Sequence, residues 1–120
     1  MARIMVVDDS HMIRKALRLY LEGGNHEIVA EASDGEDAVK AYAKFKPDLV
    51  TMDIAMPEMT GIEALGLIME MDSEAKVVMV SSINEKDLVV KAIELGAKSF
   101  VLKPMSREKT LQVIDEVLAK

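Results

Sequence analysis

The sequence predicts an α/β fold in which a doubly wound parallel sheet of five strands carries helices on both faces. Short apolar segments alternate five times with segments whose apolar residues recur at helical spacing, and this alternation is typical of parallel strands joined by right-handed helical crossovers. The segments at 4–7 and 77–80 are apolar throughout, which indicates strands buried on both faces. Polar residues follow directly where apolar strands end, and this places them together at one edge of the sheet.

The strands are predicted from short apolar runs bounded by turn residues. They lie at residues 4–7, 27–32, 49–52, 77–80 and 99–102. The second strand alternates polar and apolar residues, so we expect it at an edge of the sheet. Because no linker, low-complexity segment or repeat interrupts the pattern, we expect residues 1–120 to form one domain.

The helices are predicted from apolar residues that share one helical face. The residues expected to face the core are Ile13, Ala16, Leu17, Tyr20 and Leu21 in the first helix, Ala38, Ala41, Tyr42 and Phe45 in the second, Ile62, Leu65 and Met69 in the third, Val89, Ala92 and Ile93 in the fourth, and Leu111, Ile114, Val117 and Leu118 in the fifth. Arg14 and Arg18 take the opposite face of the first helix. We expect Thr60 or Gly61, Asn84 and Ser106 to cap the third, fourth and fifth helices.

Composition excludes several classes of protein. The formal net charge of −6 argues against a nucleic-acid surface, which needs clustered Lys and Arg. The lack of cysteine excludes a disulfide framework and a thiolate site. No apolar run is long enough for a membrane span or a signal peptide. We therefore expect a cytoplasmic monomer with no membrane contact, whose core is aliphatic and filled out by some of the ten methionines.

Four of the predicted strands end in polar residues that share one edge of the sheet. Asp8 and Asp9 follow the first strand, Asp53 the third, Ser81 the fourth and Lys103 the fifth. Ligands of doubly wound sheets bind beyond the carboxyl ends of the strands, so we expect one shared crevice. Three carboxylates within ~4 Å repel one another by about 4 kcal/mol per pair at an effective dielectric near 20. Such a cluster takes up protons or binds a cation.

An all-oxygen set of ligands favours a hard cation, and we expect Mg²⁺. Lys103 and the hydroxyl of Ser81, in the same crevice, can donate hydrogen bonds to a phosphoryl group. Taken singly, each residue has a simpler interpretation: Asp8 and Asp9 as charges at a helix start, Ser81 as a cap, and Lys103 as an edge residue that reaches solvent. Their occurrence together at matching strand ends favours a phosphoryl site that depends on Mg²⁺.

The motifs resemble the receiver domain of response regulators. They are Val-Asp-Asp-Ser at 7–10, Met-Asp-Ile-Ala-Met-Pro-Glu-Met-Thr-Gly at 52–61, Ser81, and Lys103 followed by Pro104. Among members of this family, the chain is most similar to the single-domain chemotaxis type, and the resemblance covers the whole chain. It implies a flavodoxin-like sheet with strand order 2-1-3-4-5 and five helices.

The resemblance also implies a role for each matching residue. Asp53 would be the phosphoacceptor, a carboxylate nucleophile. Asp8, Asp9, Asp53 and the backbone carbonyl of Ala55 would hold Mg²⁺, and Lys103 would neutralise a phosphoryl oxygen.

A second group of implied roles concerns the signal. Ser81 would move to bind the phosphoryl group, and Phe100 would turn inward into the space that Ser81 leaves. This switch would alter the face formed by the fourth helix, the fifth strand and the fifth helix. The Lys103–Pro104 peptide bond would be cis, as in the family. The phosphodonor would be a histidine kinase, and a flagellar motor switch, another kinase and an adaptor are open candidates for the target.

We therefore expect a signalling phosphoacceptor rather than a turnover enzyme, with at most self-phosphorylation and slow autodephosphorylation. One alternative is a Mg²⁺-dependent phosphatase or phosphotransferase with an aspartyl nucleophile, but 120 residues leave no room for a substrate-specificity cap. Another is a flavodoxin-like electron carrier, but Asp8 and Asp9 would repel the flavin phosphate and the chain has no Trp. The kinase, the target and membership of a longer regulator stay open.

Overall fold

The computed structural model describes residues 1–120, and its centre is a sheet of five parallel strands. The strands are β1 (Arg3–Val7), β2 (Glu27–Ala32), β3 (Leu49–Asp53), β4 (Val77–Ser81) and β5 (Ser99–Leu102). Their order across the sheet is β2-β1-β3-β4-β5. The predicted doubly wound fold and strand order are confirmed, and the polar second strand lies at an edge as expected.

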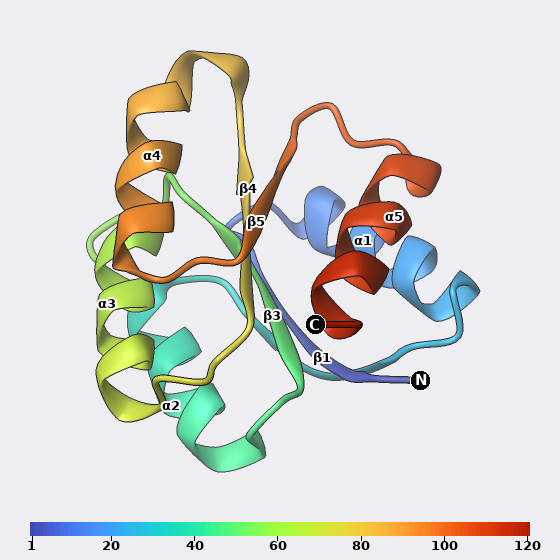
Figure 1. The fold of residues 1–120 in the computed structure, drawn as a ribbon, viewed down its shortest axis with the longest axis horizontal. Helices are drawn as coiled ribbons and strands as arrows, with labels where there is room; N and C mark the ends of the chain where they lie inside the picture. The colour runs from blue at the N-terminus through green and yellow to red at the C-terminus, as the bar shows by residue number, and fades with distance from the viewer.

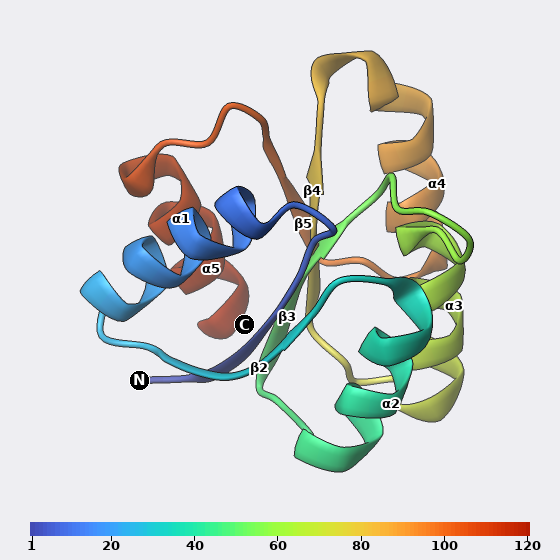
Figure 2. The same cartoon turned by 180° about the vertical axis from the view of Figure 1, so that it is seen from behind.

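Five α-helices cover the two faces of the sheet. They are α1 (His11–Gly23), α2 (Gly35–Phe45), α3 (Gly61–Met71), α4 (Lys86–Leu95) and α5 (Arg107–Leu118), and a 3₁₀ turn at Ile83–Glu85 precedes α4. Figures 1 and 2 show α1 and α5 on one face and α2, α3 and α4 on the other. No helix combines the length and the apolar character needed to cross a membrane.

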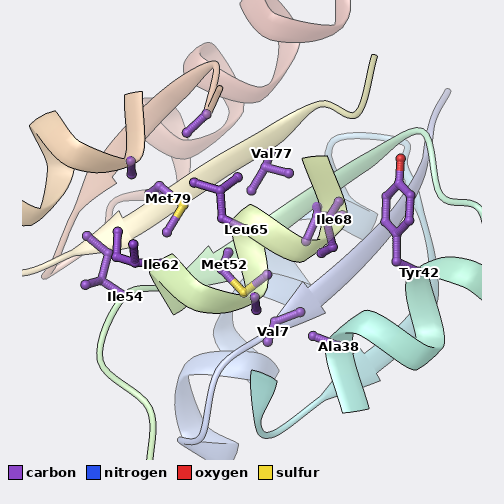
Figure 3. Packing of buried hydrophobic residues seen from close by; sticks show 14 of the residues in the cluster. Val7, Ala38, Tyr42, Met52, Ile54, Ile62, Leu65, Ile68, Val77 and Met79 are labelled. Carbon is purple, nitrogen blue, oxygen red and sulfur yellow. The ribbon is translucent and has the colours of Figure 1, made fainter. Parts of the chain in front are cut away.

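The core has two layers, one on each face of the sheet. The larger packs side chains of α2, α3 and α4 against the sheet, and Figure 3 shows Leu65 of α3 facing Met52 and Met79 on the strands. The smaller lies beneath α1 and α5 and includes Leu17 and Ile114. Both are almost wholly aliphatic, as the composition predicts, and burial of these side chains supplies most of the driving force for folding.

Most helices begin at a residue whose side chain satisfies a free backbone N–H group. Ser10, Asp34, Thr60 and Ser106 each accept a hydrogen bond from the N–H three residues further on. Thr60, rather than Gly61, is therefore the cap of α3, and Glu63 completes a capping box with it. These caps fix where the loops beyond β1, β2, β3 and β5 turn into helices.

Three details of the sequence prediction are wrong. Asn84 does not cap α4, because it lies inside the 3₁₀ turn, where Glu85 Oε1 accepts from the backbone N–H of Ser82 at 2.7 Å. Phe45 is exposed because it is the last residue of α2, beyond the edge of the core, with Lys44 above its ring. Ile93 is exposed as well. The apolar residues of α4 are distributed around the whole helix, and only the side with Val89 and Ala92 is buried.

Candidate functional site

The residues predicted at the strand ends converge at the carboxyl edge of the sheet. In the strand register Val7 lies beside Met52 and Asp53 lies beside Val80, so β1, β3 and β4 end at nearly the same level. One carboxylate oxygen from each of Asp8, Asp9 and Asp53 lies within 4.8 Å of the other two. The structure thus brings the three predicted carboxylates into one acidic cluster.

Lys103 supplies a positive charge to this cluster. Its Nζ atom lies 3.3 Å from Oδ1 of Asp53 and 3.4 Å from Oδ2 of Asp8. Burial of Lys103 opposes its charged form, but the attraction of Asp53 and Asp8 outweighs this effect and raises the pKa of the ammonium group. Lys103 is therefore held as a cation between two acidic side chains. The Lys103–Pro104 peptide bond that follows is cis.

Asp8 is fully buried and is held by its neighbours on several sides. Its backbone N–H donates to the carbonyl oxygen of Ala32 at 3.1 Å, and its Oδ1 accepts from the backbone N–H of Ser10 at 2.9 Å. Its Oδ2 accepts no hydrogen bond, although Lys103 is close enough for an ion pair. A buried carboxylate oxygen without a hydrogen bond is costly. This oxygen is therefore available to a further cationic partner.

Asp53 ends β3 and is only 3% exposed. Loss of solvent and the nearby charge of Asp8 raise the pKa of Asp53 from 3.8 to about 7, while Lys103 opposes the shift. Burial is the largest cause of the raised pKa, and the repulsion from Asp8 adds to it although Lys103 is close by. A divalent cation at this position would relieve the same repulsion.

The acidic cluster fits Mg²⁺. The three side chains offer only oxygen atoms, their spacing allows one ion to contact all of them, and Oδ2 of Asp8 lacks a hydrogen bond. Hard oxygen ligands in this number, with room for water or a phosphate oxygen, are what Mg²⁺ takes up in proteins. Ala55, the predicted carbonyl ligand, is exposed in the loop that follows β3.

The predicted switch residues lie on two neighbouring strands. Ser81, the last residue of β4, is buried, and its hydroxyl has no hydrogen-bond partner. Phe100 lies on β5, is 41% exposed, and therefore points at least partly into solvent. A hydroxyl that lacks a partner can bind a phosphoryl oxygen without first breaking another bond.

The loop between β3 and α3 is tied tightly to the end of β3. The N–H of Gly61 donates to the carbonyl oxygen of Ile54 at 2.9 Å. A Cβ atom at Gly61 would collide with the backbone carbonyl of Asp53, which cannot move aside as a flexible side chain could. The glycine therefore allows the loop that contains Ala55 to close against the phosphoacceptor candidate.

One contact at the site could not be predicted from the sequence. Arg14 was expected on the outer face of α1, but its Nη1 atom donates to the backbone carbonyl of Asp8 at 2.7 Å and its Nε donates to Glu31 at 3.1 Å. No spacing rule links residues 8, 14 and 31, since they meet only when β1, α1 and β2 pack together.

Two pockets help to delimit the site. One of about 530 Å³ opens beside Asp9 and Ala55, between the loop after β3 and α4. Another of about 670 Å³ lies among Tyr42, Asp72 and Asp115, away from the strand-end residues. In the second pocket the Tyr42 hydroxyl donates to Asp72 at 2.7 Å, so its polar groups hold the fold together. Of these two pockets, the first adjoins the acidic cluster, through Asp9.

Comparisons with known proteins agree with this geometry. Residues 4–115 match the model of the response regulator receiver domain. The chain is 46% identical to Protein CcdB of Bacillus subtilis, over 98% of both chains. It is 42% identical to the chemotaxis protein CheY of Listeria monocytogenes, over 97% of this chain and 98% of that protein. A chain in the crystal structure of the CheX–CheY–BeF₃–Mg²⁺ complex of Borrelia burgdorferi matches with a TM-score of 0.94 and 39% identity, over 98% of this chain and 90% of that one.

Proposed function

Because this chain belongs to the response regulator receiver domain family, we propose that it accepts a phosphoryl group on Asp53 from a histidine kinase of a two-component system. The observation that carries this proposal is the meeting of Asp8, Asp9 and Asp53 with Lys103 at one edge of the sheet. We take residues 1–120 as a single receiver domain of the CheY-like type.

The chemistry follows from the position of Asp53. An oxygen of its carboxylate attacks the phosphorus atom of a phosphohistidine, a P–O bond forms, and the P–N bond breaks. The imidazole nitrogen keeps the electron pair of that bond and takes one proton from water, so it leaves as neutral histidine. Lys103, 3.3 Å from Asp53 Oδ1, stabilises the charge that gathers on the phosphoryl oxygens.

Asp8, Asp9, Asp53 and the carbonyl of Ala55 would hold Mg²⁺. When bound, the ion supplies a Lewis acid for the phosphoryl oxygens. Asp8 is prepared for this role because the N–H of Ser10 occupies one of its oxygens and leaves the other without a hydrogen bond.

Ser81 and Phe100 would report the new phosphoryl group. The free hydroxyl of Ser81 moves to bind a phosphoryl oxygen, and the exposed ring of Phe100 turns into the space that is vacated. Burying phenylalanine leaves no hydroxyl without a partner, so this rotation has no polar desolvation cost. A phosphoryl-mimic complex whose Phe100 ring stays outward would contradict the coupling.

The output surface would be the face of α4, β5 and α5. Val90, Phe100 and Leu102 leave apolar surface exposed there, and the inward turn of Phe100 would change its shape. Since several relatives are chemotaxis proteins, we propose a chemotaxis-type role, with a flagellar motor switch as one candidate target. We further expect a cytoplasmic monomer that does not bind nucleic acid.

The test is the intact mass of the protein after incubation with acetyl phosphate and Mg²⁺, for wild type and Asp53→Asn. We expect a gain of one phosphoryl group that needs Mg²⁺ and is lost in the variant. Steady release of inorganic phosphate that depends on Asp53, without a mass gain, would instead indicate the aspartyl phosphatase. If neither a mass gain nor a release of phosphate is observed, both functions are refuted.

A further inference from the structure

Arg14 of α1 contacts the peptide group that joins two members of the acidic cluster, Asp8 and Asp9. Asp8 and Asp9 are consecutive, and the carbonyl of Asp8 belongs to the peptide unit that joins them. Arg14 Nη1 donates to this carbonyl at 2.7 Å. Because a peptide unit is planar and rigid, holding its carbonyl oxygen restricts the orientation of the peptide plane and the position of the Asp9 Cα.

Arg14 is itself held in place. Its Nε donates to Oε1 of Glu31 at 3.1 Å, and the Arg14 side chain is only 17% exposed. Hydrogen bonding from Arg18, opposed by partial burial and aided by Arg14, lowers the pKa of Glu31, so this carboxylate stays charged near neutral pH. One guanidinium group thus links the peptide after Asp8 to β2.

Arg18 provides an internal comparison. It lies one turn further along α1 and donates to Oε2 of the same Glu31 at 2.6 and 3.0 Å. Its hydrogen bonds reach Glu31 and Glu22, and none reaches the Asp8–Asp9 peptide. Two arginines of like charge therefore share one carboxylate, but only Arg14 contacts the backbone of the acidic cluster.

We infer that Arg14, oriented by Glu31, is a positioning residue that holds the Asp8–Asp9 peptide in the conformation needed to bind Mg²⁺. This inference rests on the proposed function, because it concerns the same ion. The effect acts through geometry. Arg14 presents two N–H groups in a fixed fork, one toward the Asp8 carbonyl and one toward Glu31, whereas a lysine ammonium is a single point of charge on a flexible stem.

The expected size of the effect follows from other metal sites. Replacing residues that hydrogen-bond to metal ligands, without contacting the metal themselves, typically lowers metal affinity by about 10- to 100-fold. We expect Arg14→Lys to weaken Mg²⁺ binding by about 10-fold, since the positive charge stays nearby and only the fixed orientation is lost. Arg18→Lys removes the same kind of group from the same carboxylate, and we expect its Mg²⁺ affinity to stay within about 2-fold of wild type.

The experiment is a Mg²⁺ titration by calorimetry, with the thermal midpoint of each metal-free protein measured in parallel. Wild type, Arg14→Lys, Arg18→Lys and Glu31→Gln are compared. Glu31→Gln keeps the side-chain length but removes the charge that orients Arg14, so we expect a smaller loss of affinity than for Arg14→Lys. It also preserves the test if Arg14→Lys does not fold.

Each outcome decides the inference. The inference is supported if Mg²⁺ binding is weaker in Arg14→Lys but not in Arg18→Lys, and the thermal midpoints of these two variants are close together. Unchanged affinity in Arg14→Lys overturns it, and so does an equal loss in Arg18→Lys, which would indicate a merely structural role for the α1–β2 contact. If Arg14→Lys does not fold, wild-type affinity in Glu31→Gln overturns the inference. Failure of wild type to bind Mg²⁺ would instead refute the proposed function, and the inference with it.

Discussion

Replacing Asp53 with asparagine should make the metal-free protein more stable at alkaline pH. Asp53 is almost fully buried, and its burial together with the charge of Asp8 raises the pKa of its carboxyl group from 3.8 to about 7. A raised pKa in the folded state means that ionised Asp53 opposes folding. Asparagine has nearly the same shape and carries no charge, so it removes this cost.

The size and sign of the effect follow from proton linkage. Between pH 3.8 and about 7 the folded protein binds more protons at Asp53 than the unfolded chain does, so this group's contribution to stability falls as the pH rises. With about 1.4 kcal/mol for each pKa unit, ionisation of Asp53 costs about 2 kcal/mol of folding stability at pH 5 and about 4 kcal/mol at pH 8. Above pH 8 the cost no longer grows.

Urea unfolding in the presence of EDTA measures this prediction. For an unfolding slope of ~2 kcal/mol per molar urea, the urea midpoint of Asp53→Asn should exceed that of wild type by roughly 2 M at pH 8 and by roughly 1 M at pH 5. Mg²⁺ at 100 times its dissociation constant adds about 2.7 kcal/mol to the unfolding free energy of wild type. The difference between the urea midpoints of the variant and wild type should then become smaller. A variant no more stable than wild type at pH 8, or an advantage that is the same at both pH values, would refute the reasoning.

Three further predictions concern the same framework. Lys103→Met should lower stability at pH 8 and raise the pKa of Asp53 beyond 7, because the nearest cation is lost. A carboxyl ¹³C titration that shows a lower pKa of Asp53 in the variant than in wild type would contradict this. Gly61→Ala should cost about 3 kcal/mol, because its Cβ meets backbone, whereas Gly66→Ala, with nothing near its Cβ, should gain up to about 1 kcal/mol; equal effects in urea unfolding would refute the contrast. Tyr42→Phe should cost about 2 kcal/mol through its lost bond to a carboxylate, and unchanged stability would exclude a net contribution from that bond.

The acidic cluster could be predicted because its residues follow strands that local pattern reveals. Strand ends in a parallel sheet meet at one edge whatever the details of packing, so Asp8 and Asp53 had to lie near each other once the strands were identified. Caps such as Ser106 were readable for a similar reason, since a cap acts on backbone groups only three residues away.

Helix faces were predicted less well. Phe45 and Ile93 have the right spacing for a core position, yet both are exposed. Spacing gives the direction of a side chain around its helix, but it does not say how far the sheet extends beneath that position. Where a helix carries apolar residues on all of its sides, as α4 does, the sequence pattern cannot show which side is buried.

Short-range patterns of apolar and polar residues were enough to predict the fold class and the meeting of Asp8, Asp9, Asp53 and Lys103 at one edge of the sheet. The packing of the folded chain sets the pKa of Asp53 and the contacts that hold these residues in place. The raised pKa of Asp53 comes from burial by neighbouring strands, and Arg14 reaches the Asp8 carbonyl because α1 packs beside β1 and β2. Desolvation and contacts between distant segments depend on distances in space, which spacing along the chain does not contain.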